Sequence, residues 1–474
     1  MSLPPLSLDT VFYPKSVAII GASADERPDG GGWVASLLHF GFRGPIYPIN
    51  PRAREILGLK AYASLDDVPG PVDLAIFNVP RSLVTKLMGD CVAKKVKVAH
   101  IYTAGFRETA HKEWELAQAE FSRIARDGGV RLVGPNCMGI YCPDSGLTWA
   151  RGFPKEPGTV AFVSQSGASA SRLVPAAAAR GVRFSKVVSY GNAVDLDCTD
   201  FLEYLARDGQ TEIIAAYVEG VKEGRRFLEA VKACRNTKPV VLLKAGATQG
   251  GSRAAASHTA ALAGSPAIWD AFYRQSGAIK VETLEEIIDV LVTFLFAPKL
   301  SGRGVGIVGR GGGLGVMATD LCEKAGLRVP AFTARTQERL QKLTPEAGTS
   351  VSNPVEPDTK VQAWSRFYEE GLRIVAEDPK VDLILAHLAV DVYGGRTAPV
   401  LTELEEASEI LVNVSKILTK PLAVVFYPGS GQETIDAVVA AQARCVAAGL
   451  PVYPSIEAAA RAASRFLDYK EAIR

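Results

Sequence analysis

The sequence lacks the features that mark polyanion-binding, exported and membrane-spanning proteins. Its 53 basic residues are nearly balanced by 51 acidic ones, so the net charge of +2 gives no general attraction to nucleic acid or to an anionic membrane surface. The longest apolar stretch, about Ile287 to Pro298, is interrupted by Asp289 and Thr293, and the N-terminus has no apolar stretch of signal length. We therefore expect a cytoplasmic protein with no nucleic-acid partner and no membrane segment.

Paired cysteines are also missing. The seven cysteines are odd in number and scattered, and no two of them form a C-x-x-C pair. This pattern excludes a disulfide framework and a cysteine-based metal site, and it is typical of reduced thiols. We predict no metal ligands in this chain.

What the sequence does contain is a regular alternation of structural signals over 474 residues, a length that predicts two to four domains. Short β-branched apolar runs alternate with longer amphipathic stretches from end to end, which predicts an α/β protein built on parallel sheets. Turn-forming clusters at residues 154–158 and 297–304 divide the chain. The predicted domains are residues 1–154, 155–300 and 301–474.

The expected strands end in Gly, Pro, Asn or Ser, and such strand ends are where an open parallel sheet binds its ligand. In the first region these runs are residues 16–23, 44–50, 73–79, 98–106 and 130–136. A buried strand precedes Ser164, and others are expected at residues 184–191, 213–220, 239–246, 303–313, 381–390 and 421–429.

The first strand is followed by a glycine-rich turn, residues 21–32, that could approach a phosphate closely. It is not G-x-G-x-x-G, and the second strand ends at Asn50 rather than at the acidic residue of an NAD site. Arg52 and Arg54 follow and would suit an extra phosphate. The pattern favours a phosphate-bearing ligand over a merely tight turn. A literal G-x-G-x-x-G at residues 304–309 lies inside an expected strand, so the run at 311–315 is the better anion-binding candidate.

His258 stands in SRAAASHTAALAGS, residues 252–265, among small side chains. A single histidine is more often structural than catalytic, but small residues cannot pack closely around an imidazole and they let a second surface approach it. A neutral imidazole with a pKa of about 6.5 is available as a nucleophile. We therefore predict that His258 is presented for chemistry.

Two further features could complete a phosphoryl site around His258. Ser164, Gln165, Ser166 and Gly167 follow a strand and begin an apparent helix, where unpaired amides favour an anion; an ordinary capped helix would look the same. Glu219 ends a buried strand and could accept a hydrogen bond from one ring nitrogen of His258, although a solvated loop glutamate is the alternative.

Taken in order, GASADERP, TAGF at 103–106, GPNCMG at 134–139, VSQSGA at 163–168, YVEG at 217–220 and SHTAALAG at 257–264 resemble a known family. The chain is similar to the α subunit of NDP-forming acyl-CoA synthetases, the group of ADP-forming acetyl-CoA synthetase and, more distantly, succinyl-CoA synthetase. The resemblance implies a Rossmann-like CoA-binding domain, a flavodoxin-like phosphohistidine domain and a flavodoxin-like domain of the ligase-CoA type.

The resemblance also implies roles for individual residues. His258 would be transiently phosphorylated, Glu219 would be its hydrogen-bonded partner, and Ser164 to Gly167 would hold phosphate. The coenzyme A site would be formed by Gly21, Ala22, Ser23, Asn50, Arg52, Pro80, Thr103, Ala104, Gly105, Phe106 and Asn136. In the implied reaction, acyl-CoA and phosphate give acyl phosphate and CoA, the phosphoryl group moves to His258, and ADP or GDP receives it.

The family's ATP-grasp domain, which holds ATP/ADP or GTP/GDP with Mg²⁺, has no counterpart in the sequence. A separate β subunit is therefore expected, in a heterodimer or heterotetramer, and the acid substrate stays open because Met138 and Arg310 depart from the usual loops. The alternatives are a CoA transferase or an acyl-CoA-binding component that works without a nucleotide subunit, a CoA-responsive interaction module and, last, an NAD oxidoreductase.

Overall fold

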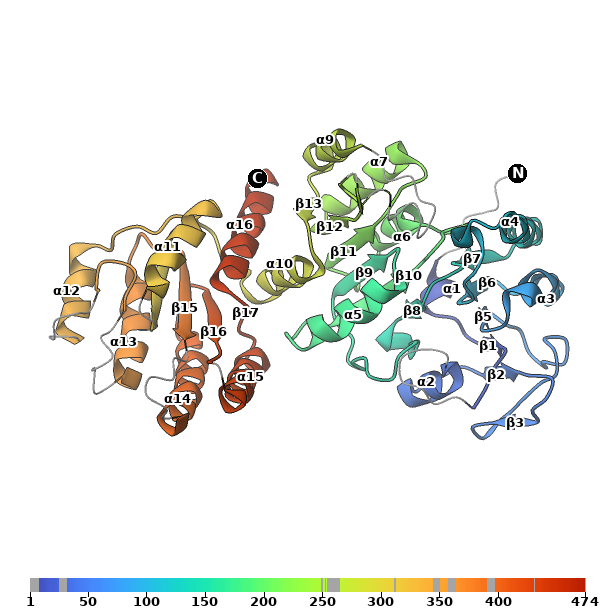
Figure 1. Cartoon of the computed structure of the whole chain (residues 1–474), viewed down its shortest axis with the longest axis horizontal. Coiled ribbons are helices and arrows are strands. Elements are labelled where there is room, and N and C mark those ends of the chain that lie inside the picture. Colours follow the sequence, from blue (N-terminus) through green and yellow to red (C-terminus); the bar gives the residue numbers. More distant parts are fainter. Residues whose placement is uncertain are drawn as a thin grey trace. The chain divides into compact units, whose positions relative to one another are not determined.

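The computed structural model describes residues 8–24, 32–248, 250–251, 253, 265–310, 313–343, 350–356, 364–389, 397–429 and 431–473. They divide into two compact units: residues 1–178 with 183–287, and residues 179–182 with 288–474. Three separate, mainly parallel sheets with intervening helices confirm the predicted α/β class (Figure 1). The two boundaries between the three domains expected from the sequence remain a prediction. None of the described helices is both long and apolar enough to cross a membrane.

The first sheet lies in the first unit and has the order β2-β1-β5-β6-β7, with all neighbours parallel. Its strands are β1 (Val17–Ile20), β2 (Ile46–Ile49), β5 (Leu74–Phe77), β6 (Val98–Ile101) and β7 (Arg131–Val133). Its helices are α1 (Asp9–Phe12), α2 (Trp33–Phe40), α3 (Arg81–Ala93) and α4 (Lys112–Asp127), and a small hairpin joins β3 (Glu55–Ile56) to β4 (Leu59–Lys60).

The two faces of this sheet pack against different helices. Ala99 and Ile101 belong to the core that includes residues of α3 and α4. His100 lies between them in β6 and its ring contacts Trp33 of α2 at 5.1 Å, so α2 covers the opposite face, since successive side chains of a strand alternate. β1 and β5 are buried along their whole length, which is why they read as unbroken apolar runs in the sequence.

The second sheet also lies in the first unit, with the order β13-β12-β11-β9-β10-β8. Its strands are β8 (Gly139–Tyr141), β9 (Val160–Ser164), β10 (Phe184–Ser189), β11 (Ile213–Val218), β12 (Val240–Lys244) and β13 (Ile279–Val281). Its helices are α5 (Gly167–Ala178), α6 (Cys198–Leu205), α7 (Gly224–Arg235) and α9 (Pro266–Ser276). β8 pairs antiparallel with β10, while the other pairs are parallel.

The third sheet forms the second unit, with the order β14-β15-β16-β17. Its strands are β14 (Val305–Arg310), β15 (Leu383–Ala389), β16 (Leu422–Tyr427) and β17 (Val452–Tyr453). The helices are α10 (Leu284–Phe296), which begins in the first unit, α11 (Leu314–Lys324), α12 (Ala334–Leu343), α13 (Trp364–Glu377), α14 (Thr397–Ser415), α15 (Gln432–Ala447) and α16 (Ile456–Ala472). The G-x-G-x-x-G run lies in β14 and pairs with β15, as expected for a sequence that only mimics a nucleotide loop.

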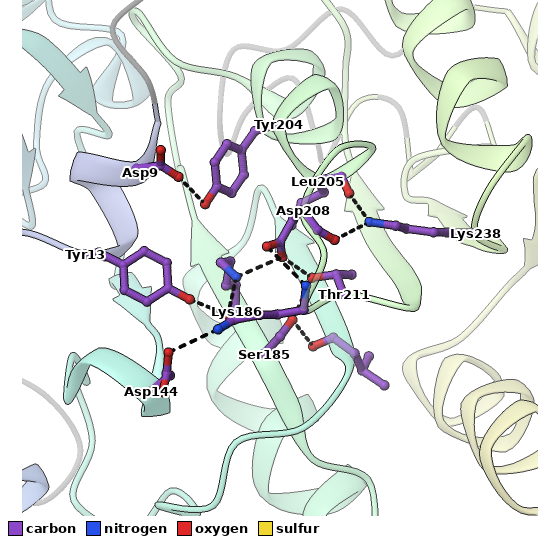
Figure 2. Close-up of polar contacts among 12 residues, drawn as sticks. Asp9, Tyr13, Asp144, Ser185, Lys186, Tyr204, Leu205, Asp208, Thr211 and Lys238 are labelled. Atoms are coloured by element: carbon purple, nitrogen blue, oxygen red, sulfur yellow. Dashed lines mark hydrogen bonds and ion pairs between the residues drawn. The ribbon is translucent and has the colours of Figure 1, made fainter.

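A cluster of polar side chains around the buried Lys186 ties the N-terminal segment to the second sheet (Figure 2). Lys186 of β10 is 1% exposed, and its Nζ lies 2.8 Å from Oδ2 of Asp208 and 2.9 Å from Oε1 of Gln210. The Tyr13 hydroxyl donates to the same Gln210 oxygen, and Gln210 Nε2 donates to Asp144 at 3.1 Å. Because a buried ammonium needs a counter-charge and hydrogen bonds, this cluster holds Tyr13 and Asp144 against the strand that carries Lys186.

Candidate active site

A cavity of about 590 Å³ opens where the carboxyl ends of the first and second sheets meet. The residues that line it come from the turns after β5, β6 and β9 and from the loop after β7: Asn78, Val79, Pro80, Tyr102, Thr103, Ala104, Asn136, Cys137, Met138, Gln165, Ser166, Gly167 and Ala168. Seven of these were predicted as site residues: Pro80, Thr103, Ala104, Asn136, Gln165, Ser166 and Gly167. The fold therefore brings four of the eleven predicted CoA residues and three of the four residues of the predicted phosphate turn to one cavity.

The phosphate turn is built as a helix start that faces this cavity. Ser166 caps α5, since its Oγ accepts a hydrogen bond from the Ser169 N–H at 3.2 Å. Ser164 is fully buried and its Oγ donates to the Ser166 carbonyl at 2.7 Å, so it supports the turn from behind. A Cβ at Gly167 would lie 2.7 Å from Cγ of Met138, which explains why glycine begins the helix here. The N–H groups at the start of α5 can receive an anion.

Gln165 connects this turn to the predicted catalytic glutamate. Its side-chain oxygen accepts hydrogen bonds from the backbone N–H groups of Glu219 at 2.9 Å and Gly220 at 3.1 Å. Both Gln165 and Glu219 are buried, at 6% and 4% exposure. Glu219 is therefore held beside the phosphate turn. Its expected partner, His258, lies outside the described residues, and the pairing of the two stays a prediction.

The predicted CoA residues of the first glycine turn have mainly structural contacts. Gly21 has a φ of +84°, and a Cβ there would lie 2.2 Å from the Asn78 carbonyl oxygen, so only glycine fits. Asn50 donates through Nδ2 to the Ala22 carbonyl and accepts at Oδ1 from the Arg52 N–H, both at 2.8 Å. Asn50 thus connects the turn after β2 to the turn after β1. The side chains of Ser23 and Arg52 are exposed.

The TAGF segment divides between the cavity and the core. Thr103 donates through Oγ1 to the Val79 carbonyl at 2.7 Å, which joins the turns after β5 and β6. Gly105 accepts a hydrogen bond from Arg81 at 2.8 Å. Phe106 is fully buried and its ring contacts Phe121 at 5.2 Å, so it packs in the core and does not line the cavity.

Six residues that line the cavity were not among the predicted site residues: Asn78, Val79, Tyr102, Cys137, Met138 and Ala168. Asn78 and Tyr102 directly follow β5 and β6, so their position after a buried strand was the available signal. Tyr102 contacts the Trp33 ring at 5.7 Å, and Trp33 in turn packs on His100, the pKa of which is lowered by burial to about 4.

The described lining of the cavity carries no charged side chain. The backbone N–H groups and the dipole at the start of α5 can supply positive potential at this site. Among the described residues, no group of three or more His, Cys, Asp or Glu side chains is arranged to hold a metal ion.

Comparisons with known proteins agree with this division of the site. Residues 15–143 match the family model described as "CoA binding domain", and residues 157–294 match "Succinyl-CoA ligase like flavodoxin domain". The α subunit of acetate–CoA ligase [ADP-forming] II from Pyrococcus furiosus is 37% identical over 457 residues, which cover 96% of this chain and 96% of that one. The chain belongs to the α subunits of the ADP-forming acetate–CoA ligases.

A further relative extends well beyond the region that it shares with this chain. Acetate–CoA ligase [ADP-forming] I from Archaeoglobus fulgidus is 40% identical over 383 residues, which are 80% of this chain and 55% of the relative. The chain thus spans about half the length of that enzyme. The solved structure of an acetyl-coenzyme A synthetase from Ca. Korarchaeum cryptofilum, in complex with phosphate and ADP, has a TM-score of 0.81 at 30% identity and covers 98% of this chain and 97% of that chain.

In this α subunit, the predicted anion-binding run of the third region is engaged internally where it is described. The Gly315 N–H at the start of α11 donates to the Glu356 carboxylate at 2.7 Å, while Gly311 and Gly312 lie outside the described residues. Burial raises the pKa of Glu356, and the Gly315 hydrogen bond opposes that shift. The Glu356 carboxylate therefore already accepts the hydrogen bond that a ligand anion would need from the Gly315 N–H.

Proposed function

We propose that this chain is the CoA-binding and phosphoryl-transferring half of an ADP-forming acyl-CoA synthetase, working through acyl phosphate and phosphorylated His258. The observation that carries the proposal is the single cavity that joins the start of α5 to the loops of the segment matched as a CoA-binding domain. A thioester held by those loops and a phosphate held by α5 would meet there. The membership in the ligase family supports this function and not that of a CoA transferase.

The proposed reaction proceeds in three steps. A phosphate oxygen attacks the thioester carbonyl, a C–O bond forms as the C–S bond breaks, and CoA leaves as a thiol after it takes up a proton. A ring nitrogen of His258 then attacks the phosphorus, and the carboxylate leaves. Finally, an oxygen of the ADP β-phosphate takes the phosphoryl group and frees the imidazole.

The residues around the cavity would act mainly by positioning and by stabilising charge. The α5 N–H groups would bind the phosphate, and Glu219 would accept a hydrogen bond from the His258 ring nitrogen that does not react. Thr103, Asn136 and Met138 would line the path of the thioester end of CoA. Phosphoryl transfer depends chiefly on such placement, which suits a lining of uncharged polar groups.

The remaining parts of the reaction would come from a partner. The relative from Archaeoglobus fulgidus is about twice as long as the region that it shares with this chain. Its length supports a second half of the enzyme on another subunit. We assign this half to an ATP-grasp β subunit that binds ADP with Mg²⁺. The two subunits would form a heterodimer or heterotetramer in the cytoplasm. The names of the relatives favour ADP over GDP.

The uncharged lining of the cavity also limits which carboxylic acids can be substrates. A second carboxylate on the acyl group would be moved from water into a cavity where none of the described residues supplies a cation, which is unfavourable. We therefore propose a small monocarboxylic acid as substrate. In an assay with the reconstituted enzyme, acetate should give a higher kcat/KM than succinate, and equal values would contradict the proposal.

The decisive experiment is covalent labelling of the purified chain. Incubation with acetyl-CoA and radioactive phosphate, or with radioactive acetyl phosphate, should place an acid-labile phosphoryl group on the wild type and none on His258→Ala. His111→Ala, at an exposed histidine that precedes α4, should label like the wild type. A wild-type chain that takes no label from either donor would overturn the proposal. CoA, and not NAD, should raise the melting temperature.

A further inference from the structure

Asn192, in the loop that follows β10, is bonded to both of the loops that follow β6 and β7 and line the cavity. Its backbone N–H donates to the Pro135 carbonyl at 2.9 Å. Its side-chain Nδ2 donates to Oε2 of Glu108 at 2.6 Å and to Oε1 of Gln118 at 3.1 Å. Its Oδ1 accepts a hydrogen bond from Nδ2 of Asn136 at 3.4 Å. Both hydrogens and the oxygen of the Asn192 amide are therefore engaged.

The backbone beside Asn192 also fits closely against Asn136, which lines the cavity. A Cβ at Gly191 would lie 2.2 Å from the Asn136 carbonyl oxygen, so only glycine allows this approach. Asn136 has a φ of +58°, a left-handed conformation that asparagine adopts more readily than most residues. Its N–H donates to the Thr103 carbonyl at 3.1 Å. The Asn136 backbone is therefore held from two sides, by the loop after β6 and by the loop after β10.

Glu108 gives the hydrogen bonds of this network a fixed direction. Its Oε1 accepts the Gly105 N–H at 2.6 Å, while its Oε2 accepts from Asn192. An ionised carboxylate only accepts hydrogen bonds, so the NH₂ end of the Asn192 amide faces Glu108 and the oxygen end faces Asn136. Asn136 must in turn offer its own Nδ2 to that oxygen.

The side-chain oxygen of Asn136 is the acceptor that remains at the end of this series. Within the part of the chain that the structure describes, the Asn136 side chain makes no hydrogen bond besides the one to Asn192. The charge of Glu108 thus determines, through Asn192, that the Asn136 oxygen stays available to a hydrogen-bond donor.

We propose that Glu108 and Asn192 are positioning residues for coenzyme A, and that they keep the side-chain oxygen of Asn136 available to accept an amide N–H of the pantetheine arm. The inference rests on the proposed function. The pantetheine arm carries amide N–H donors, whereas a thioester carbonyl only accepts hydrogen bonds and acetyl phosphate has no N–H. Asn136 belongs to the described lining of the cavity and Glu108 and Asn192 do not, so the latter two act through Asn136.

The test compares two routes to the phosphorylated chain, only one of which uses the pantetheine arm. Asn192→Asp places a second carboxylate against Glu108 and removes the NH₂ group that fixes the direction of the network. It should raise the KM for acetyl-CoA about tenfold when the label comes from acetyl-CoA and radioactive phosphate. Labelling by radioactive acetyl phosphate should keep the wild-type rate. Asn236→Asp, at the exposed end of α7, should match the wild type with both donors.

Exchanging the two groups separates the orientation of the amides from general damage to the loops. Glu108→Gln keeps an acceptor for the Gly105 N–H but can also donate toward Asn192, so it should raise the KM for acetyl-CoA as well. In the double variant Glu108→Gln with Asn192→Asp, the carboxylate at position 192 can accept from both of its neighbours, and the Asn136 oxygen is available again. The double variant should recover most of the wild-type KM.

Three results would overturn the role of Glu108 and Asn192: a wild-type KM for acetyl-CoA in both single variants, equal slowing of Glu108→Gln with both phosphoryl donors, or no recovery in the double variant. In each case, labelling of the wild type leaves the proposed function standing. A wild-type chain that takes no label from either donor would instead reject the proposed function.

Discussion

The side-chain oxygen of Gln165 accepts the backbone N–H of Glu219 at 2.9 Å, across 54 residues of sequence. This hydrogen bond joins the turn that begins α5 to the end of β11, so the candidate phosphate site and the candidate orienting acid are held as one structure. Movement of either turn would therefore change the distance between the bound phosphate and the carboxylate that serves His258.

Two substitutions at Gln165 distinguish its structural role, which is to hold the two turns together, from an effect on anion binding. Gln165→Ala leaves the N–H groups of Glu219 and Gly220 without their acceptor, which costs about 1 to 3 kcal/mol for a buried group and should lower the melting temperature. Gln165→Glu keeps an acceptor oxygen but adds a negative charge beside the phosphate turn. It should melt near the wild type and raise the KM for phosphate about tenfold. Equal melting temperatures for Gln165→Ala and Gln165→Glu would contradict this account.

Gly167→Ala should narrow the cavity without weakening the fold. The added Cβ would lie 2.7 Å from Cγ of Met138, so that side chain must move, while alanine is a better helix former than glycine at the start of α5. We expect a KM for acyl-CoA about tenfold higher at an unchanged melting temperature. The double variant Gly167→Ala with Met138→Ala should recover most of the affinity, and a failure to do so would place the effect elsewhere.

Tyr102 should influence the size of the acid that is accepted. Its ring lines the cavity and rests against Trp33. Tyr102→Ala should enlarge the pocket and shift the ratio of kcat/KM for butyrate over acetate upward by about tenfold or more, since each methylene in an apolar pocket is worth about 1 to 3 kcal/mol. The control is Tyr47→Ala, at a tyrosine of β2 whose ring packs on Tyr62 instead. An unchanged ratio for Tyr102→Ala would contradict its place beside the acyl group.

The Lys186–Asp208 pair should make stability depend on acid pH. Burial acts to raise the pKa of Asp208, but hydrogen bonds from Lys186 and Thr211 outweigh it and hold that pKa below its ordinary value. A carboxyl with a lowered folded-state pKa stabilises the protein above its unfolded-state pKa of about 3.9, and this contribution is lost as the pH falls through the lower folded value. Asp208→Asn should therefore show a smaller fall in melting temperature than the wild type between pH 5 and pH 3.

At neutral pH, the same variant should be the less stable protein. Asp208→Asn leaves the ammonium of Lys186 buried without its counter-charge, at a cost of about 3 to 5 kcal/mol. The double variant Lys186→Met with Asp208→Asn removes that unpaired charge and should melt at a higher temperature than Asp208→Asn alone. The opposite order would show that Lys186 does not depend on Asp208.

Much of the fold could be predicted because the signals are local. β12, for example, begins with the apolar run Val240 to Leu243, which lies between Pro239 and a turn at Gly246, and such a run is typical of a strand buried on both faces. β8 and β13 were missed because neither shows an apolar run: β8 begins at a glycine and is paired only with β10, and Lys280 interrupts β13. The turn after Ser164 was predicted for the same local reason as β12, since it follows a strand and begins a helix.

The sequence by itself thus determined the class of fold, the turn at Ser164 to Gly167, and the residue types from which the site would be built. Only the tertiary structure decided which of those residues meet. It placed Phe106 in the core, joined Asn50 to the turn after β1, and brought the Gln165 side chain to the backbone of Glu219. No local pattern contains this information, because contacts between residues dozens of positions apart depend on strand order and on packing between separate elements.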